Sequence, residues 1–369
     1  PQLVMACDIN DYWTGTNVAT EIIDSDVKEF IHETGFTGFH VNGVAGLWFN
    51  INNSSGDTER LGPDVYPDPN TFETLETFII HNYHAGASTH IWLWGSDGWG
   101  STTGPDGIGG AMSRADRHLL KYIAARLGPI PGWSMGYGYD LQEWADANEL
   151  QTWYDFFKSH LGGWEHLIGA RADVYDVTNA EMRRLVNEGG EMNRRPLFDV
   201  YWSGDYVGYY DYRVGYPWYV YVREFADKPH FQEDRFRIRV NDVFKFKDYT
   251  PNMTIRGLWH STMAGGVANI WGNLVHNDED DRSGSYPYDN QAAATIRETQ
   301  IKVDIKNDIK TYYVFWFDKG RFCHDYIIDN QLTGNHPGND VLSDVREPIS
   351  VCLRDEAFDH YVLYSEDAE

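Results

Sequence analysis

The sequence has 369 residues, of which 42% are hydrophobic and 23% charged, so it is a globular chain long enough for one large barrel or two ordinary domains. Its 56 acidic and 30 basic residues give a formal net charge of −26. This charge disfavours nucleic acid, anionic membranes and strongly sulfated polymers as partners, and it suits a neutral or weakly charged ligand better. No apolar run approaches the roughly 20 residues of a membrane span, and residues 1–11 lack the layout of a secretory signal.

Short strand-like runs alternate with helix-like segments along most of the chain, a pattern typical of a parallel sheet with helices outside it. The predicted strands are 3–7, 38–41, 89–94, 130–136, 167–172, 197–202, 228–231 and 266–271. The predicted helices are 24–34, 71–84, 113–127, 149–161, 178–187, 254–263 and 290–309. Eight strands predict an α/β fold of the (β/α)₈ TIM-barrel type. An open doubly wound sheet is the alternative, but its glycine-rich phosphate-binding fingerprint is missing.

The predicted barrel covers residues 1–310, and residues 311–369 are expected to form a short C-terminal β-rich extension. Three β-like runs support this division, at 312–317, 349–353 and 360–364. They are separated by turn-like segments, as in a small β module.

Aromatic residues make up 15% of the chain, with 14 Trp and 24 Tyr, which is more than core packing usually requires. Trp and Tyr rings pack against the C–H faces of sugar rings while their polar atoms bond neighbouring groups. We therefore expect a carbohydrate ligand, although packing inside a large barrel accounts for roughly half of these rings.

Acidic residues that follow strand ends are the candidates for chemistry, because barrel active sites lie at the carboxyl ends of the strands. Asp140 follows the fourth predicted strand and Glu233 the seventh. Glycoside hydrolysis needs two carboxyl groups beside one bond, one protonated and one ionised. Aromatic neighbours such as Tyr137 desolvate a nearby acid and so separate the two pKa values. We predict Asp140 and Glu233 as the catalytic pair, with Glu143 as the alternative acid.

Other polar and aromatic side chains near the predicted strand ends are candidates for binding the sugar. They are His40, Asn42, Trp94, Tyr137, Tyr201, Trp202, Asp205 and Trp271. Of these, Trp94 and Trp202 are suited to stacking on sugar rings, while ordinary packing is the alternative for every one. No cofactor or metal is expected, because the histidines form neither H-x-H nor H-E-x-x-H. The acidic run 278–281 favours a solvated loop over a calcium site.

Two motifs resemble those of apiosidase-like (β/α)₈-barrel glycoside hydrolases: GWSMGYGYD at 132–140, and MAGGVANIWG at 263–272. Together with Glu233 after the seventh strand, they extend the resemblance over roughly residues 1–309. It implies that Asp140 protonates the leaving group and that Glu233 is the nucleophile of a retaining mechanism. One departure is Tyr139-Asp140, where many barrel glycosidases have Asn-Glu, so the nucleophile is better supported than the acid.

The expected function is hydrolysis of a neutral or weakly charged poly- or oligosaccharide, with an extracellular or periplasmic location. Three alternatives stay open. The sequence GWSMG at 132–136 matches the G-x-S-x-G elbow of serine esterases with Ser134 as nucleophile, although Pro129 and Pro131 precede it where an elbow needs an apolar strand. A non-catalytic carbohydrate-binding protein, or a lyase, would explain the aromatic residues equally well.

Overall fold

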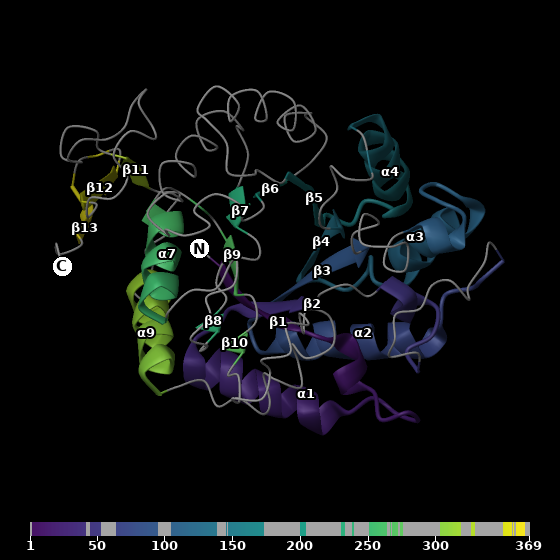
Figure 1. Ribbon diagram of the computed structural model, residues 1–369, viewed down its shortest axis with the longest axis horizontal. Coiled ribbons are helices and arrows are strands. Elements are labelled where there is room, and N and C mark those ends of the chain that lie inside the picture. The colour runs from purple at the N-terminus through teal and green to yellow at the C-terminus, as the bar shows by residue number, and fades with distance from the viewer. Residues whose placement is uncertain are drawn as a thin grey trace.

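The computed structural model describes residues 2–41, 45–52, 64–94, 105–138, 145, 147–172, 200–203, 230–232, 238–239, 251–263, 266, 268–271, 274–275, 303–318, 326–328, 350–355, 357 and 359–365. In this part of the chain, eight parallel strands close into a barrel (Figure 1). In barrel order they are β1 (Gln2–Cys7), β2 (Gly38–Val41), β3 (Ser88–Trp94), β4 (Trp133–Gly138), β5 (Leu167–Ala172), β6 (Val200–Ser203), β7 (His230–Gln232) and β9 (Ala268–Trp271). The predicted (β/α)₈ fold is confirmed.

The barrel closes through β9, which pairs with β7 on one side and with β1 on the other. Phe231 is in register with Ala268, and Ile270 with Val4. A separate two-stranded parallel sheet is formed by β8 (Ile238–Arg239) and β10 (Leu274–Val275). Because all the barrel strands are parallel, their carboxyl ends share one end of the barrel, called the rim below.

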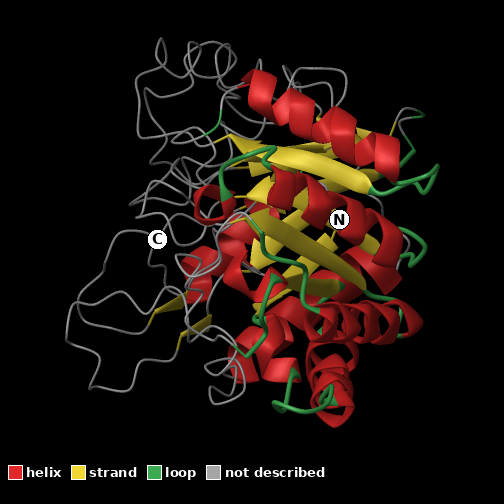
Figure 2. Ribbon diagram, turned by 90° about the vertical axis from the view of Figure 1, so that its right-hand side faces the viewer, coloured by secondary structure: helices red, strands yellow, loops and turns green. Residues whose placement is uncertain are grey.

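Helices surround the strands, as Figure 2 shows for one side of the molecule. They are α1 (Thr20–Asp26) with its continuation η2 (Val27–Thr34), α2 (Pro69–His84), α3 (Arg114–Arg126), α4 (Ala147–His160), α7 (Pro251–Met263) and α9 (Val303–Tyr313) with its continuation η9 (Val314–Asp318). Short helical turns are η1 (Ile9–Tyr12), η3 (Ala45–Trp48) and η6 (Pro105–Ile108). The start of α3 is capped by Ser113, whose side chain accepts a hydrogen bond from the Asp116 backbone N–H.

The main core lies between the strands and the helices. Phe39 of β2 packs edge-on against Phe30 of η2 and Phe78 of α2, with ring centroids 6.1 and 5.4 Å apart. Successive side chains of a strand point to opposite faces, so His40, the next residue, points into the barrel. The alternation defines an outer, helix-facing set of residues and an inner set that fills the barrel.

The C-terminal part differs from the prediction at 312–317, which is helical and not β-like. This segment continues α9 and η9, so helix crosses the predicted domain boundary at residue 310. The buried side chains of Ile309, Tyr312 and Trp316 recur at helical spacing. The Tyr312 hydroxyl also hydrogen-bonds Thr262 of α7 at 2.6 Å. Packing on α7 therefore overrides the strand propensity of the aromatic residues.

A small antiparallel sheet follows, built from β11 (Tyr326–Ile328), β12 (Ser350–Asp355) and β13 (Tyr361–Ser365). The strands predicted at 349–353 and 360–364 correspond to β12 and β13. Tyr364 stacks on Trp259 of α7 at a centroid distance of 6.1 Å, which joins the sheet to the barrel helices. Within the described residues, no helix is both long and apolar enough to cross a membrane.

Candidate active site

The rim of the barrel is where the predicted catalytic residues leave their strands. Glu233 is the residue directly after Gln232, the last of β7, and Asp140 comes two residues after Gly138, the last of β4. Five predicted site residues lie outside the described residues: Asp140, Glu143, Glu233, Asn42 and Asp205. The structure thus describes the strands that precede Asp140 and Glu233, and both strands end at the same rim.

Three further predicted residues belong to barrel strands whose backbone is described. Tyr201 is in register with Ala170 and His230, and Trp202 with Arg171 and Phe231. Trp271 is in register with Met5 of β1.

A polar and aromatic layer fills the barrel between β2, β3 and β4. His40 is in register with His90, and His90 with Ser134. The His40 and His90 rings stack at 4.9 Å, and Trp92 meets His40 edge-on at 4.4 Å. His90 Nδ1 is hydrogen-bonded to Ser134 Oγ at 3.1 Å. His40 thus lies inside the barrel, where it is buried and belongs to this layer.

Burial favours the neutral form of His90 in this layer. It lowers the pKa of His90 well below its ordinary value, and the neighbouring His40 lowers it further, while the contact with Ser134 opposes the shift. His90 and Trp92 were not among the predicted site residues. Their signal was the alternation in STHIWLW at 88–94, in which His90 and Trp92 share one face of the strand.

Ser134, the nucleophile of the esterase alternative, is the second residue of β4. Four more strand residues follow it. A nucleophile elbow needs the serine on a sharp turn between a strand and a helix. The backbone at Ser134 lacks this turn, so the G-x-S-x-G match does not correspond to an elbow.

Two aromatic residues lie elsewhere than predicted. The Tyr137 ring packs against Trp153 of α4 at 4.3 Å and is 1% exposed, so it belongs to the helix-facing side of β4 and not to the pocket. Trp94 is fully buried at the end of β3. Its indole lies beside Asp116 of α3. Burial raises the pKa of Asp116 to about 6, although the hydrogen bonds from the Met112 N–H and the Trp94 indole oppose this increase. Trp94 therefore packs between the end of β3 and the start of α3.

Asp8, the first residue after β1, is an additional carboxyl group at the rim. By the alternation of side chains along β1, Asp8 lies on the same face of the strand as Val4, and the backbone of residue 6 between them is in register with His40. Its Oδ1 accepts the Asn10 N–H at 3.2 Å. Burial raises the pKa of Asp8 to about 7, and nearby Asp11 contributes to the increase, while the backbone N–H groups of residues 9 and 10 oppose it. Asp8 is therefore partly protonated near neutral pH.

No group of three or more potential metal ligands occurs among the described residues. Three carboxyl groups follow strand ends at the rim: Asp8 follows β1, and β4 and β7 lead into Asp140 and Glu233. Such a set can hold one carboxyl group protonated and another ionised.

The fold is similar to that of solved carbohydrate-active enzymes. The endo-β-1,4-mannanase of Thermotoga petrophila aligns with a TM-score of 0.58 at 13% identity, covering 100% of this chain and 91% of that one. A glycoside hydrolase family 5 protein of Bacteroides vulgatus aligns at 0.57 and 12%, covering 96% and 74%. A family 5 mannosidase of Rhizomucor miehei aligns at 0.56 and 11%, covering 85% and 93%. No protein-family model matches the sequence, and no curated protein matches it either. At these identities the likeness establishes the fold, a (β/α)₈ barrel shared with glycoside hydrolases.

Proposed function

We propose that the protein is a glycoside hydrolase that cleaves a neutral or weakly charged poly- or oligosaccharide at the rim of its barrel. The observation that carries this proposal is the closed parallel barrel, in which β4 and β7 lead into Asp140 and Glu233 at the same end. The likeness in fold to mannan-degrading and other glycoside hydrolases supports the reaction class. The finer assignment to apiosidase-like enzymes rests on the motifs at 132–140 and 263–272.

In the proposed mechanism, Asp140 protonates the glycosidic oxygen while the Glu233 carboxylate attacks the anomeric carbon. The bond to the leaving sugar breaks, and a covalent glycosyl-enzyme forms on Glu233. Asp140, now ionised, removes a proton from a water molecule, which displaces Glu233 and releases the sugar with its configuration retained. Glu143 is the alternative to Asp140 in the acid–base role.

The test is the turnover of aryl glycosides and of neutral polysaccharides, β-mannan included, by Glu233→Gln and Asp140→Asn. We expect Glu233→Gln to lower kcat by more than about a hundredfold for every substrate. For Asp140→Asn, we expect a large loss with poor leaving groups and a small loss with nitrophenolates, which need no protonation to leave. Glu143→Gln distinguishes the two candidates for the acid–base role, because a large loss in Glu143→Gln with little loss in Asp140→Asn would assign that role to Glu143.

The same variants separate the competing functions. Retained sugar binding by Glu233→Gln together with lost turnover supports a hydrolase, whereas unchanged turnover refutes the assignment of Glu233. A purified protein that binds saccharides and cleaves none would be a carbohydrate-binding protein. Loss of ester hydrolysis in Ser134→Ala, without an effect of Glu233→Gln, would favour the esterase.

A further inference from the structure

A pocket of about 350 Å³ lies between the segment before α2 and the first two turns of α3. Its volume is within the range of small-molecule binding sites. The lining residues that matter below are Asp64, Tyr66, Arg114, Arg117, His118 and Lys121.

The pocket is basic in a strongly acidic protein. Arg114, Arg117, His118 and Lys121 are spaced at i, i+3, i+4 and i+7, so they form one face of α3. Asp64 is the acidic residue of the described lining, and its carboxylate is 3.5 Å from Arg114. Three cations and a histidine thus face one carboxylate, in a chain with 56 acidic and 30 basic residues.

The position of this basic face in α3 strengthens its positive potential. The first turn of a helix carries the positive end of the helix dipole and normally favours acidic residues. The acid in this turn, Asp116, is buried, with its carboxylate accepting the Met112 N–H at 2.7 Å. Arg117 donates to the Met112 carbonyl at 2.7 Å, and Lys121 lies over the Phe156 ring at 5.7 Å. These contacts orient the cations without neutralising them.

An exposed aromatic ring borders the basic residues. Tyr66 is 66% exposed, and its ring meets that of His118 edge-on at 5.5 Å. A sugar ring can pack its C–H face on such a tyrosine. Arg guanidinium groups bind carboxylates through paired hydrogen bonds. A sugar that carries a carboxylate suits this arrangement, because its ring can pack on the tyrosine while its carboxylate binds the arginines.

The pocket lies near the rim. The Trp48 indole of η3 donates to the carbonyl of Leu93 at 2.7 Å, and the backbone N–H of Asp68 donates to the Trp48 carbonyl at 2.8 Å. On the other side, Trp94 at the end of β3 interacts with Asp116 in the first turn of α3. The starts of α2 and α3 therefore adjoin the carboxyl end of β3. The pocket therefore lies at the same end of the barrel as the rim.

We propose that this pocket binds a hexuronate unit of the saccharide on which the barrel acts, with the carboxylate at Arg114 and Arg117 and the ring on Tyr66. The proposal rests on the proposed function, and it adds an acidic sugar, away from the cleaved bond, to an otherwise neutral substrate. The net charge of −26 repels polyanions, but the basic face of α3 provides local positive charge at which a single carboxylate can bind.

The test is calorimetric binding of two matched ligands, a cello-oligosaccharide and the same oligosaccharide oxidised to carboxylates at C6. Full-length Glu233→Gln is used so that cleavage does not interfere. We expect the oxidised ligand to bind about tenfold more tightly, with an affinity that falls as salt rises. Arg117→Ala and Tyr66→Ala should each remove most of this preference, and Arg117→Lys should restore part of it. Lys28→Ala is the control, because Lys28 is an exposed cation of η2 that pairs with Glu33 at 3.8 Å.

Equal affinity for the two ligands would overturn the proposal, and so would equal losses in Arg117→Ala and Lys28→Ala. Equal or tighter binding of a 6-sulfated oligosaccharide would overturn the choice of a carboxylate. The proposed function is tested separately by turnover. Uronate binding without hydrolysis of any glycoside refutes the hydrolase and keeps the pocket, whereas hydrolysis without uronate binding refutes the pocket alone.

Discussion

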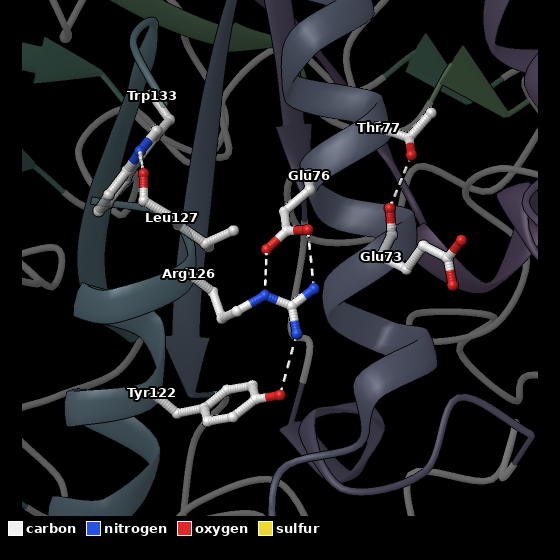
Figure 3. Close-up of polar contacts among 7 residues, drawn as sticks. All are labelled: Glu73, Glu76, Thr77, Tyr122, Arg126, Leu127 and Trp133. Atoms are coloured by element: carbon white, nitrogen blue, oxygen red, sulfur yellow. Dashed lines mark hydrogen bonds and ion pairs between the residues drawn. The ribbon is translucent and has the colours of Figure 1, made fainter. Parts of the chain in front are cut away.

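The ion pair between Arg126 of α3 and Glu76 of α2 should be a measurable source of stability (Figure 3). Arg126 Nε donates to Glu76 Oε1 at 2.5 Å, and Nη2 donates to Oε2 at 2.8 Å. Nη1 also donates to the Tyr122 hydroxyl at 2.9 Å. The hydrogen bonds to Glu76 are the main reason that the pKa of Arg126 is raised above its ordinary value. The contact joins α2 to α3, the helix that lines the basic pocket.

The expected magnitude follows from geometry and exposure. Exposed ion pairs contribute about 0–1 kcal/mol, whereas hydrogen bonds to charged groups contribute about 1.5–3 kcal/mol. The side chains of Arg126 and Glu76 are 32% and 22% exposed, and their contact is bidentate. Partial exposure to solvent reduces the upper value, so we expect a coupling energy of about 1.5 kcal/mol.

The assay is a double-mutant cycle of Arg126→Ala and Glu76→Ala, measured by urea unfolding. The cycle is needed because Arg126 also lies over the Phe72 ring at 5.9 Å, so the single variant loses packing as well. The Lys28 and Glu33 pair serves as the control, since it is 3.8 Å apart and its side chains are 75% and 57% exposed. A coupling energy no larger than that of this exposed pair would refute the reasoning.

Two further predictions concern the barrel strands. Gly38→Ala should lower the free energy of unfolding by about 2 kcal/mol or more, because a Cβ there would lie 2.2 Å from the Ser88 carbonyl oxygen of β3. The measurement is urea unfolding, and a loss below about 0.5 kcal/mol would contradict so close an approach. For Asp8, a folded pKa of about 7 against 3.8 for the free group means that the folded state keeps a proton that the unfolded state loses, so stability falls as pH rises from about 4 to 7. Asp8→Asn should remove this fall and gain about 1–3 kcal/mol relative to the native chain between pH 4 and 8. A pH-independent difference between the two proteins would show that Asp8 ionises normally.

Strand positions were predictable because apolar runs and turn residues mark them locally. The predicted 38–41 and 167–172 coincide with β2 and β5. Six of the eight barrel strands begin within two residues of the predicted start, whereas β4 and β6 begin three residues later than predicted. The face of each side chain was harder to predict, since it reverses with a shift of one residue. Tyr137 illustrates this, because its place beside an acidic residue suggested the pocket, whereas its register puts it against Trp153 of α4.

The inner layer of the barrel shows what local patterns do not contain. In β3, Trp92 faces inward and Leu93 outward, and both are buried, so hydrophobicity alone does not mark the inner face. His90 is 50 residues after His40 and 44 residues before Ser134, and only the register of three strands brings them together. No pattern within one strand predicts that contact.

The raised pKa of Asp8 arises in the same way, from burial that the folded barrel creates. Its consequence extends to the proposed chemistry. A carboxyl group with a pKa of about 7 is half-protonated at neutral pH, so it adds less negative charge at the rim than an ordinary aspartate would. Under the proposed function, the protonated form can donate a hydrogen bond to a sugar oxygen, and the ionised form can accept one from a sugar hydroxyl. A barrel end that supplies a nucleophilic carboxylate gains from such a neighbour, because each additional full negative charge would raise the pKa of that carboxylate.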